Sequence, residues 1–172
     1  MMTDYTLFVL ALLAIMIFTL LLVVFFLRQE TRRRQLEIRY KDGVELMKHR
    51  LQAYERLTLL LERLSPETLI LREQRHNLTG VAFQQHLLRV IRNEFDHNMA
   101  MQVYVNASTW EKIKSAREAL VRQINSTAAG LDPKAPALEL GRQIIEGSGG
   151  ELIQIFRSAI AAIRDEMRNY YQ

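Results

Sequence analysis

The feature that most constrains this chain is an unbroken apolar run near its start, from Tyr5 to Leu27. The run contains no charged residue, no glycine and no proline, and Arg28 ends it. As a helix that rises about 1.5 Å per residue, it would be roughly 34 Å long, enough to cross a hydrocarbon core of about 30 Å. The sequence therefore predicts a transmembrane helix. It favours a retained anchor over a cleaved signal peptide, because signal peptides have a basic start, a shorter apolar stretch and small residues at the cleavage site.

Basic residues gather directly after this run and set its expected orientation. The only charged side chain before the run is that of Asp4. The basic cluster that follows the run consists of Arg28, Arg32, Arg33, Arg34, Arg39 and Lys41. Because basic residues stay on the cytoplasmic side of a membrane, we expect a single-pass protein with its N-terminus outside and its C-terminal domain in the cytoplasm. The same cluster has the composition of a lipid-facing surface. Each basic residue close to anionic head groups contributes about 1 kcal/mol to the free energy of membrane binding. Both roles stay open, since one set of residues can serve both.

The segment 28–64 is predicted to form one long amphipathic helix, because no proline interrupts it. Apolar or nearly apolar residues recur along it at alternating intervals of four and three, which is the heptad pattern of a coiled coil. This self-association seam consists of Tyr40, Val44, Met47, Leu51, Tyr54, Thr58 and Leu61. In a parallel pair, Arg50 would face Glu55 of the partner chain. Additional leucines widen the apolar face near residue 64, so we expect the first half of the seam to self-associate and the second half to pack into a helical domain.

The remaining residues, 65–172, predict a small helical bundle with one modest core. Ser65-Pro66 and Thr79-Gly80 are typical helix starts, and the glycines at 147–150 separate the last two helices. Helices are expected at about 66–75, from 79 or 80 to about 95, at 108–127, at 137–146 and from about 151 onward. The fold class is therefore all-α, with an N-terminal anchor (1–27), a basic juxtamembrane, coiled-coil-like helix (28–64) and a helical cytoplasmic domain (65–172).

Two segments of this domain carry more specific predictions. Ser108 with Glu111 three residues later has the pattern of a capping box, in which each side chain bonds to the other residue's backbone N–H. Gln102–Val105 resembles a strand locally, but no second strand signal accompanies it. It is predicted to be an extended connector or a buried helix end.

Two Glu-x-x-His pairs are the main candidates for metal chemistry: Glu73 with His76, and Glu94 with His97. Residues three apart share a face of a helix, and ferritin-like di-iron bundles use two such pairs plus a Glu from each of two other helices. Here the pairs lie on successive segments, with no intervening helix to supply a single Glu. We therefore expect no metal site and no cofactor, and the alternative is a di-metal carboxylate oxidoreductase.

The other candidate chemistry has simpler explanations. Asp96 beside His97 could orient an acid–base catalyst, but no nucleophile motif accompanies the pair. The glycine-rich segment 146–151 lacks the lysine of a phosphate-binding loop, which favours a hinge. Basic residues of the tail are interleaved with acidic ones, and the lack of cysteine excludes disulfides and thiolate metal sites. We expect no enzyme activity and no nucleic-acid partner.

The stretch from Glu94 to Asn125 resembles an uncharacterised family of short single-pass inner-membrane proteins of Bacteroidota-type bacteria. The resemblance rests on Glu94, Asp96, His97, Asn98, Gln102, Tyr104, Val105, Trp110, Glu111, Ile113 and Ala116. The layout is also similar along most of the chain: an N-terminal span, an arginine-rich linker and a helical tail. The resemblance implies a bacterial inner-membrane location, and it assigns no activity and no site residues.

These features together favour an interaction protein over an enzyme. We expect a membrane-anchored helical scaffold, an accessory subunit of a bacterial envelope complex. Its expected partners are membrane lipid, other membrane or envelope proteins, and further copies of itself. The alternatives are the membrane-tethered di-metal protein and a sensor of anionic lipid surfaces that uses the basic cluster.

Overall fold

A computed structural model describes the backbone of residues 2–75 and 77–171. Side chains are described over the same ranges, apart from those of residues 2–4, 6–9, 11, 14, 31–33, 35–39, 42 and 171. Over these residues the chain forms six α-helices and one 3₁₀-helix and contains no β-strand. The predicted all-α class is therefore confirmed. The chain divides into two compact units, Met1–Met47 and Lys48–Gln172.

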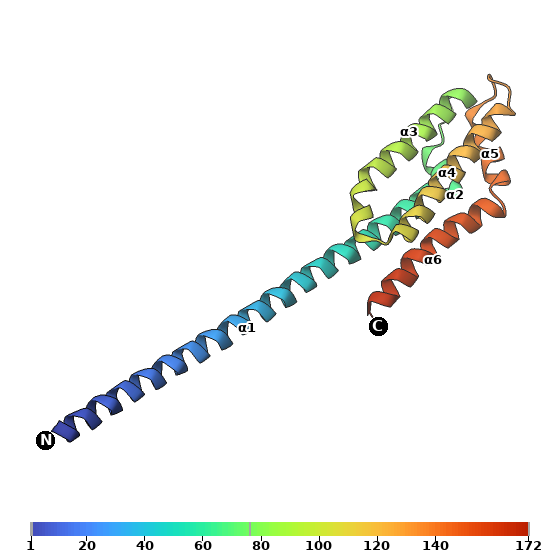
Figure 1. The fold of residues 1–172 in the computed structure, drawn as a ribbon. Coiled ribbons are helices and arrows are strands. Elements are labelled where there is room, and N and C mark those ends of the chain that lie inside the picture. The colour runs from blue at the N-terminus through green and yellow to red at the C-terminus, as the bar shows by residue number, and fades with distance from the viewer. Residues whose placement is uncertain (1, 76, 172) are drawn as a thin grey trace. The chain divides into compact units, whose positions relative to one another are not determined.

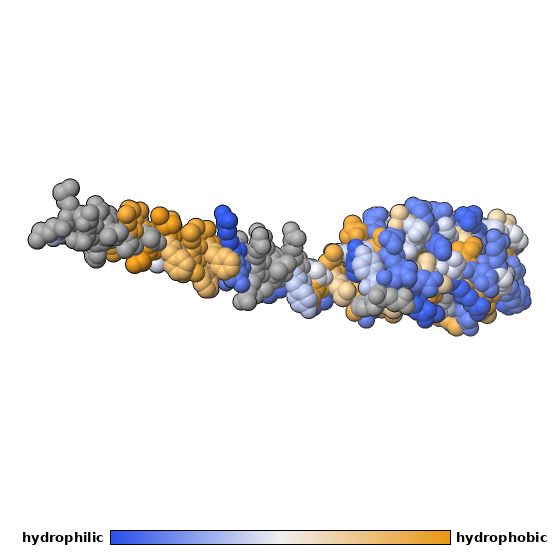
Figure 2. All heavy atoms as spheres, turned by 60° about the horizontal axis from the view of Figure 1, so that its bottom comes forward, coloured by the Kyte–Doolittle hydropathy of each residue, from blue (hydrophilic) through white to orange (hydrophobic). Residues whose placement is uncertain are grey.

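Helix α1 runs from Met2 to Leu64 and begins in the first unit. It passes residues 27 and 28 without a break, because no proline interrupts it. Every residue from Ile15 to Leu27 is exposed, and nearly all of them are large and apolar. Figure 2 shows apolar atoms gathered along this part of the helix. Because an exposed apolar surface promotes non-specific association, experiments on the whole chain need a mild detergent.

The membrane assignment is corrected by the structure. In the part of the chain that is described, no helix combines the length and the apolar character that a membrane span requires. This finding overturns the predicted transmembrane helix and the predicted location, a single-pass inner-membrane protein with an external N-terminus and a cytoplasmic C-terminal domain.

The second unit contains the end of α1 and the helices that follow it. These are α2 (Pro66–Glu73), α3 (Gly80–Asn98), the 3₁₀-helix η1 (Met99–Tyr104), α4 (Ala107–Ala129), α5 (Ala137–Gly147) and α6 (Glu151–Tyr171). Figure 1 shows α3, α4 and α6 lying alongside the end of α1, and α4 packs most extensively against α6. The short helices α2 and α5 contact each other, and α5 also packs against α3 and α4.

An apolar core holds the second unit together. Its largest fully buried side chains are Leu57, Leu60, Leu61, Leu64, Leu69, Ile70, Phe83, Leu87, Ile91, Ile113, Leu120 and Ile124. Within α1, α3 and α4 each of these residues lies three, four or seven positions from another, which keeps them on one face of the helix. Complete burial of a leucine contributes about 1.5–3 kcal/mol, so the four leucines of α1 make its end an integral part of the bundle.

Helix α4 begins earlier than the capping-box pattern predicts. Its first residue is Ala107, its N-cap residue is Asn106, and the Asn106 side chain makes no capping hydrogen bond. The backbone N–H of Asn106 donates to Oε1 of Glu166 at 2.8 Å, so a carboxylate from α6 lies at the start of α4. The predicted capping box is wrong, because Ser108 lies inside the first turn. Glu111 pairs with Lys114 at 2.7 Å instead.

The ambiguous segment 102–105 is mostly helical. The 3₁₀-helix η1 follows α3 directly and ends at Tyr104, and Val105 is extended, with φ of −117° and ψ of 159°. The Tyr104 ring stacks on the ring of His49 from α1, with centroids 5.8 Å apart. This stack anchors the connection between α3 and α4 to α1.

Candidate functional site

The two Glu-x-x-His pairs, which are the candidates for the alternative of a metal site, do not form such a site among the described residues. Arg72 contacts the carboxylates of both pairs: its Nε is 2.9 Å from Oε1 of Glu73, and its Nη2 is 3.7 Å from Oε1 of Glu94. Arg63 donates a further hydrogen bond to Glu94 from its Nε, at 3.1 Å. Guanidinium groups therefore neutralise the two carboxylates that a metal ion would need.

The histidines also differ from the predicted pattern. His76 lies outside the described residues, and Glu73 is instead 2.9 Å from Nε2 of His86 on α3. His97 Nε2 lies 3.2 Å from Nη2 of Arg56 on α1. Burial raises the pKa of the Glu73 carboxyl, but hydrogen bonds from its arginine and histidine partners outweigh this effect, and the pKa lies below its ordinary value of 4.5. The arrangement is an ion-pair network that ties α2 to α3.

The predicted lipid-facing basic cluster is described only in part. Arg28, Arg34 and Lys41 are exposed, and Nε of Arg34 donates to Oε1 of Glu30 at 2.9 Å. The side chains outside the described residues are those of Arg32, Arg33 and Arg39. Lipid binding by this cluster stays a prediction.

The predicted self-association seam divides into an exposed part and a buried part. Its exposed members are Tyr40, Val44, Met47 and Leu51. Its remaining members are Tyr54 and Leu61, which are buried in the core, and Thr58, which is half-buried. Self-association through the exposed members stays a prediction.

Arg50 is engaged within its own chain. Its guanidinium carbon lies 4.0 Å from the centre of the Tyr170 ring on α6, a cation–π contact. Its Nε is buried and has no hydrogen-bond partner. Pairing Arg50 with Glu55 of a second chain would therefore break this contact. Glu55 itself is exposed and forms no ion pair with a described residue, so it remains open to a different partner.

An apolar groove of about 500 Å³ lies between α1 and α6 in the second unit. Its apolar and hydroxyl-bearing lining consists of Leu51, Tyr54, Thr58, Leu59, Ile160, Ile163 and Met167. Glu55 of α1 and Arg164 of α6 add opposite charges to this lining. Such a groove, apolar with a few charged side chains, is the kind of surface that receives a helix of a partner protein.

One side of this groove depends on a buried carboxylate that sequence reasoning missed. Glu166 of α6 is only 6% exposed. Its Oε1 accepts hydrogen bonds from the Tyr54 hydroxyl at 3.3 Å and from the Asn106 N–H at 2.8 Å, while its Oε2 has no partner. Glu166 follows the buried Ile163 by three residues, and this spacing already places it on the buried face of α6. It joins α6 to α1 and to the start of α4.

The fold and these surfaces define an all-helical protein with an apolar groove between α1 and α6. The chain belongs to the family described as "Family of unknown function (DUF7935)", whose model matches residues 1–170. A comparison with curated proteins and a comparison with solved structures each gave no match. The family assigns no activity to the chain.

Proposed function

We propose that this protein is a helical interaction protein, a scaffold or accessory subunit of a larger complex, and that it binds a second copy of itself through the α1–α6 groove. The observation that most supports this proposal is Leu59, which is 60% exposed although it lines an apolar groove. Covering the exposed part of a leucine contributes about 1–2 kcal/mol. Leu51, which is also exposed, lies about two turns earlier on α1 and lines the same groove.

The charges of the groove favour a second copy as its occupant. Glu55 and Arg164 both line the groove, and neither forms an ion pair with a described residue. In a two-fold symmetric pair the same surface is used twice, so Glu55 of each chain can face Arg164 of the other. A purely apolar partner helix would instead leave both charges unpaired, which costs free energy as they lose water.

The alternative of a di-metal oxidoreductase gains no support from this arrangement, because Arg72 and Arg63 already neutralise Glu73 and Glu94. An origin in a Bacteroidota-type bacterium, which the sequence resemblance implies, remains part of the proposal.

Sedimentation equilibrium of the full chain in a non-ionic detergent tests the proposal. Leu59→Lys and Leu51→Lys each place a charge in the groove. Each is expected to weaken self-association about tenfold or more, because a loss of about 1.4 kcal/mol raises the dissociation constant tenfold. Leu71→Lys is the matched control, since Leu71 is 63% exposed on α2 and does not line the groove. The fluorescence of Trp110, which is buried in the core, verifies that each variant is folded.

A wild-type chain that stays monomeric at millimolar concentration would contradict the proposal. So would a Leu71→Lys variant that dissociates as readily as Leu59→Lys, because association would then follow overall charge. A dimer that resists both α1 variants would show that the groove is not the interface between copies.

A further inference from the structure

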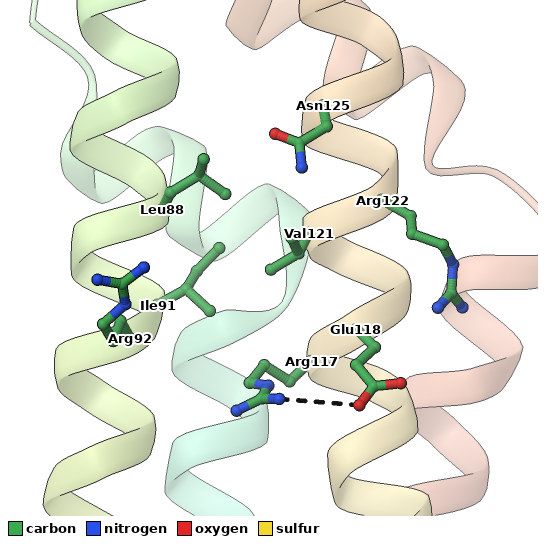
Figure 3. A pocket seen from close by; sticks show the side chains of 8 residues that line it. All are labelled: Leu88, Ile91, Arg92, Arg117, Glu118, Val121, Arg122 and Asn125. Atoms are coloured by element: carbon green, nitrogen blue, oxygen red, sulfur yellow. Dashed lines mark ion pairs between the residues drawn. The ribbon is translucent and has the colours of Figure 1, made fainter.

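We infer that a second surface, the cleft between α3 and α4, binds an acidic amphipathic helix of a different protein. The cleft has a volume of about 530 Å³ and shares no lining residue with the α1–α6 groove. Its floor is apolar, with Leu88 and Ile91 on α3 facing Val121 on α4 (Figure 3). Ile91 is buried, whereas Leu88 and Val121 are half-buried and can be covered further by a partner.

Two guanidinium groups flank this floor from opposite helices. Figure 3 shows Arg92 beside Ile91 on α3, and Arg117 extending from α4 towards α3. Arg92 forms no ion pair with a described residue. Arg117 lies over the Phe95 ring, 4.3 Å from its centre, and forms an ion pair with Glu118, which also lines the cleft, with Nη2 and Oε1 3.7 Å apart. Arg92 is therefore open to a carboxylate in the bidentate geometry that a guanidinium favours, and Arg117 can receive one in exchange for its long contact with Glu118.

A third arginine of the lining provides a contrast. Arg122 belongs to α4 and lines the cleft, but its side chain extends away from α3 (Figure 3). It contributes to the overall positive charge of the region without facing the apolar floor. Arg122 is therefore a matched control for Arg92, with the same charge at a different orientation.

The spacing of the cleft fits a helix as its occupant. Arg117, Val121 and Asn125 follow one another at intervals of four along α4, so this face extends over about 12 Å. At one end, Nε2 of Gln84 donates to Oδ1 of Asn125 at 2.9 Å and links the two helices. A partner helix with apolar residues at intervals of three and four would cover the floor. Carboxylates on its flanks would then meet the two guanidiniums.

Charge argues against a second copy of this chain as the occupant. The chain has a formal net charge of +4. A second copy brought against Arg92 and Arg117 therefore carries no overall excess of carboxylates to pair with these two guanidinium groups. The complementary partner is an acidic helix of different sequence.

Fluorescence anisotropy with a designed peptide tests the inference on the full chain in non-ionic detergent. The probe is a labelled peptide of roughly 16 residues, long enough to be helical, with leucines at intervals of three and four and glutamates elsewhere. The control peptide has the same leucines and lysine in place of every glutamate. Arg92→Glu is expected to weaken binding of the acidic peptide about tenfold or more, whereas Arg122→Glu changes it by about twofold or less. Leu59→Lys, which tests the α1–α6 groove, is expected to leave peptide binding unchanged.

Several results would overturn the inference. One is an acidic peptide that does not bind the wild-type chain. Another is an Arg122→Glu variant that binds the acidic peptide as weakly as Arg92→Glu does, because the attraction would then be a diffuse one between opposite charges. A third is a lysine peptide that binds equally well. Binding of phosphatidylglycerol vesicles or duplex DNA that is lost in Arg92→Glu, without binding of the acidic peptide, would assign the cleft to a different class of ligand. Unchanged Trp110 emission confirms in each case that the variant is folded, since Trp110 packs on Phe95 with centroids 5.3 Å apart.

Discussion

Replacing Glu166 is the most informative test of how the bundle is held together. Its Oε1 accepts two hydrogen bonds, one from the Asn106 backbone N–H and one from the Tyr54 hydroxyl, and its Oε2 has no partner. Glu166→Gln keeps an oxygen where Oε1 lies and removes the buried charge. Glu166→Leu has a similar size and removes the acceptor. The two variants therefore separate the contribution of the acceptor from that of the charge.

The magnitudes follow from the two distances. The bond to Asn106 N–H is short, at 2.8 Å, and the loss of a hydrogen bond to a charged group costs about 1.5–3 kcal/mol. The bond from Tyr54 is longer, at 3.3 Å, and contributes roughly 0.5–1 kcal/mol. Removing a buried, half-satisfied carboxylate offsets part of this loss. We expect Glu166→Leu to lower the free energy of unfolding by about 2 kcal/mol and Glu166→Gln to change it by about 1 kcal/mol or less.

Urea denaturation followed by tryptophan emission measures these differences. Trp110 is the only tryptophan of the chain and is buried in the second unit, so its emission reports on that unit. Glu118→Leu is the control, since Glu118 is an exposed glutamate on α4, and it should change the free energy of unfolding by about 0.5 kcal/mol or less. A Glu166→Gln variant as unstable as Glu166→Leu would refute the reasoning, because the charge and not the acceptor would then be essential.

Three further predictions concern backbone conformation, helix capping and pH. Gly150 has a φ of +82°, so Gly150→Ala should cost about 1 kcal/mol in urea denaturation, whereas Gly149→Ala, without a positive φ, should cost clearly less. Ser108→Ala should change the free energy of unfolding by about 0.5 kcal/mol or less, because helix α4 begins at Ala107 and Ser108 is not its cap. A loss of about 1 kcal/mol would instead show that Ser108 does act as a cap. Folding lowers the pKa of Glu73 below 4.5, so its stabilisation is present above pH 4.5 and is lost as the pH falls through the lower, folded-state value. Glu73→Gln should reduce the fall in the free energy of unfolding below pH 4.5. A variant whose stability falls with acid as steeply as that of the wild type would contradict this role of Glu73.

Local signals predicted most helix starts and ends in the second unit. Pro66 begins α2, and the Thr79 side chain caps α3 by accepting from the Ala82 N–H at 3.3 Å. The glycines at 147–150 separate α5 from α6, as their backbone freedom suggests. These signals act within one turn of helix, so the sequence carries them in full.

Interactions between distant residues explain what sequence reasoning missed. The start of α4 is set by Glu166, which is sixty positions from Asn106 in the chain, and no local pattern reports such a contact. Arg72 joins Glu73 to Glu94 and so replaces the metal that the Glu-x-x-His spacing suggested. Leu59 of α1 stays exposed in the groove between α1 and α6, yet periodicity alone does not indicate which apolar residues of a helix stay exposed.

The measurement that tests the central claim most directly is a charge exchange between two chains. Glu55→Arg alone and Arg164→Glu alone each place like charges together in a two-fold pair, so each variant should dissociate about tenfold more readily in sedimentation equilibrium. Mixing the two variants should restore association, because each interface then joins an arginine to a glutamate across the chains. If the mixture associates no better than either variant alone, the groove does not bind a second copy, and the account of this protein as a self-associating scaffold is contradicted.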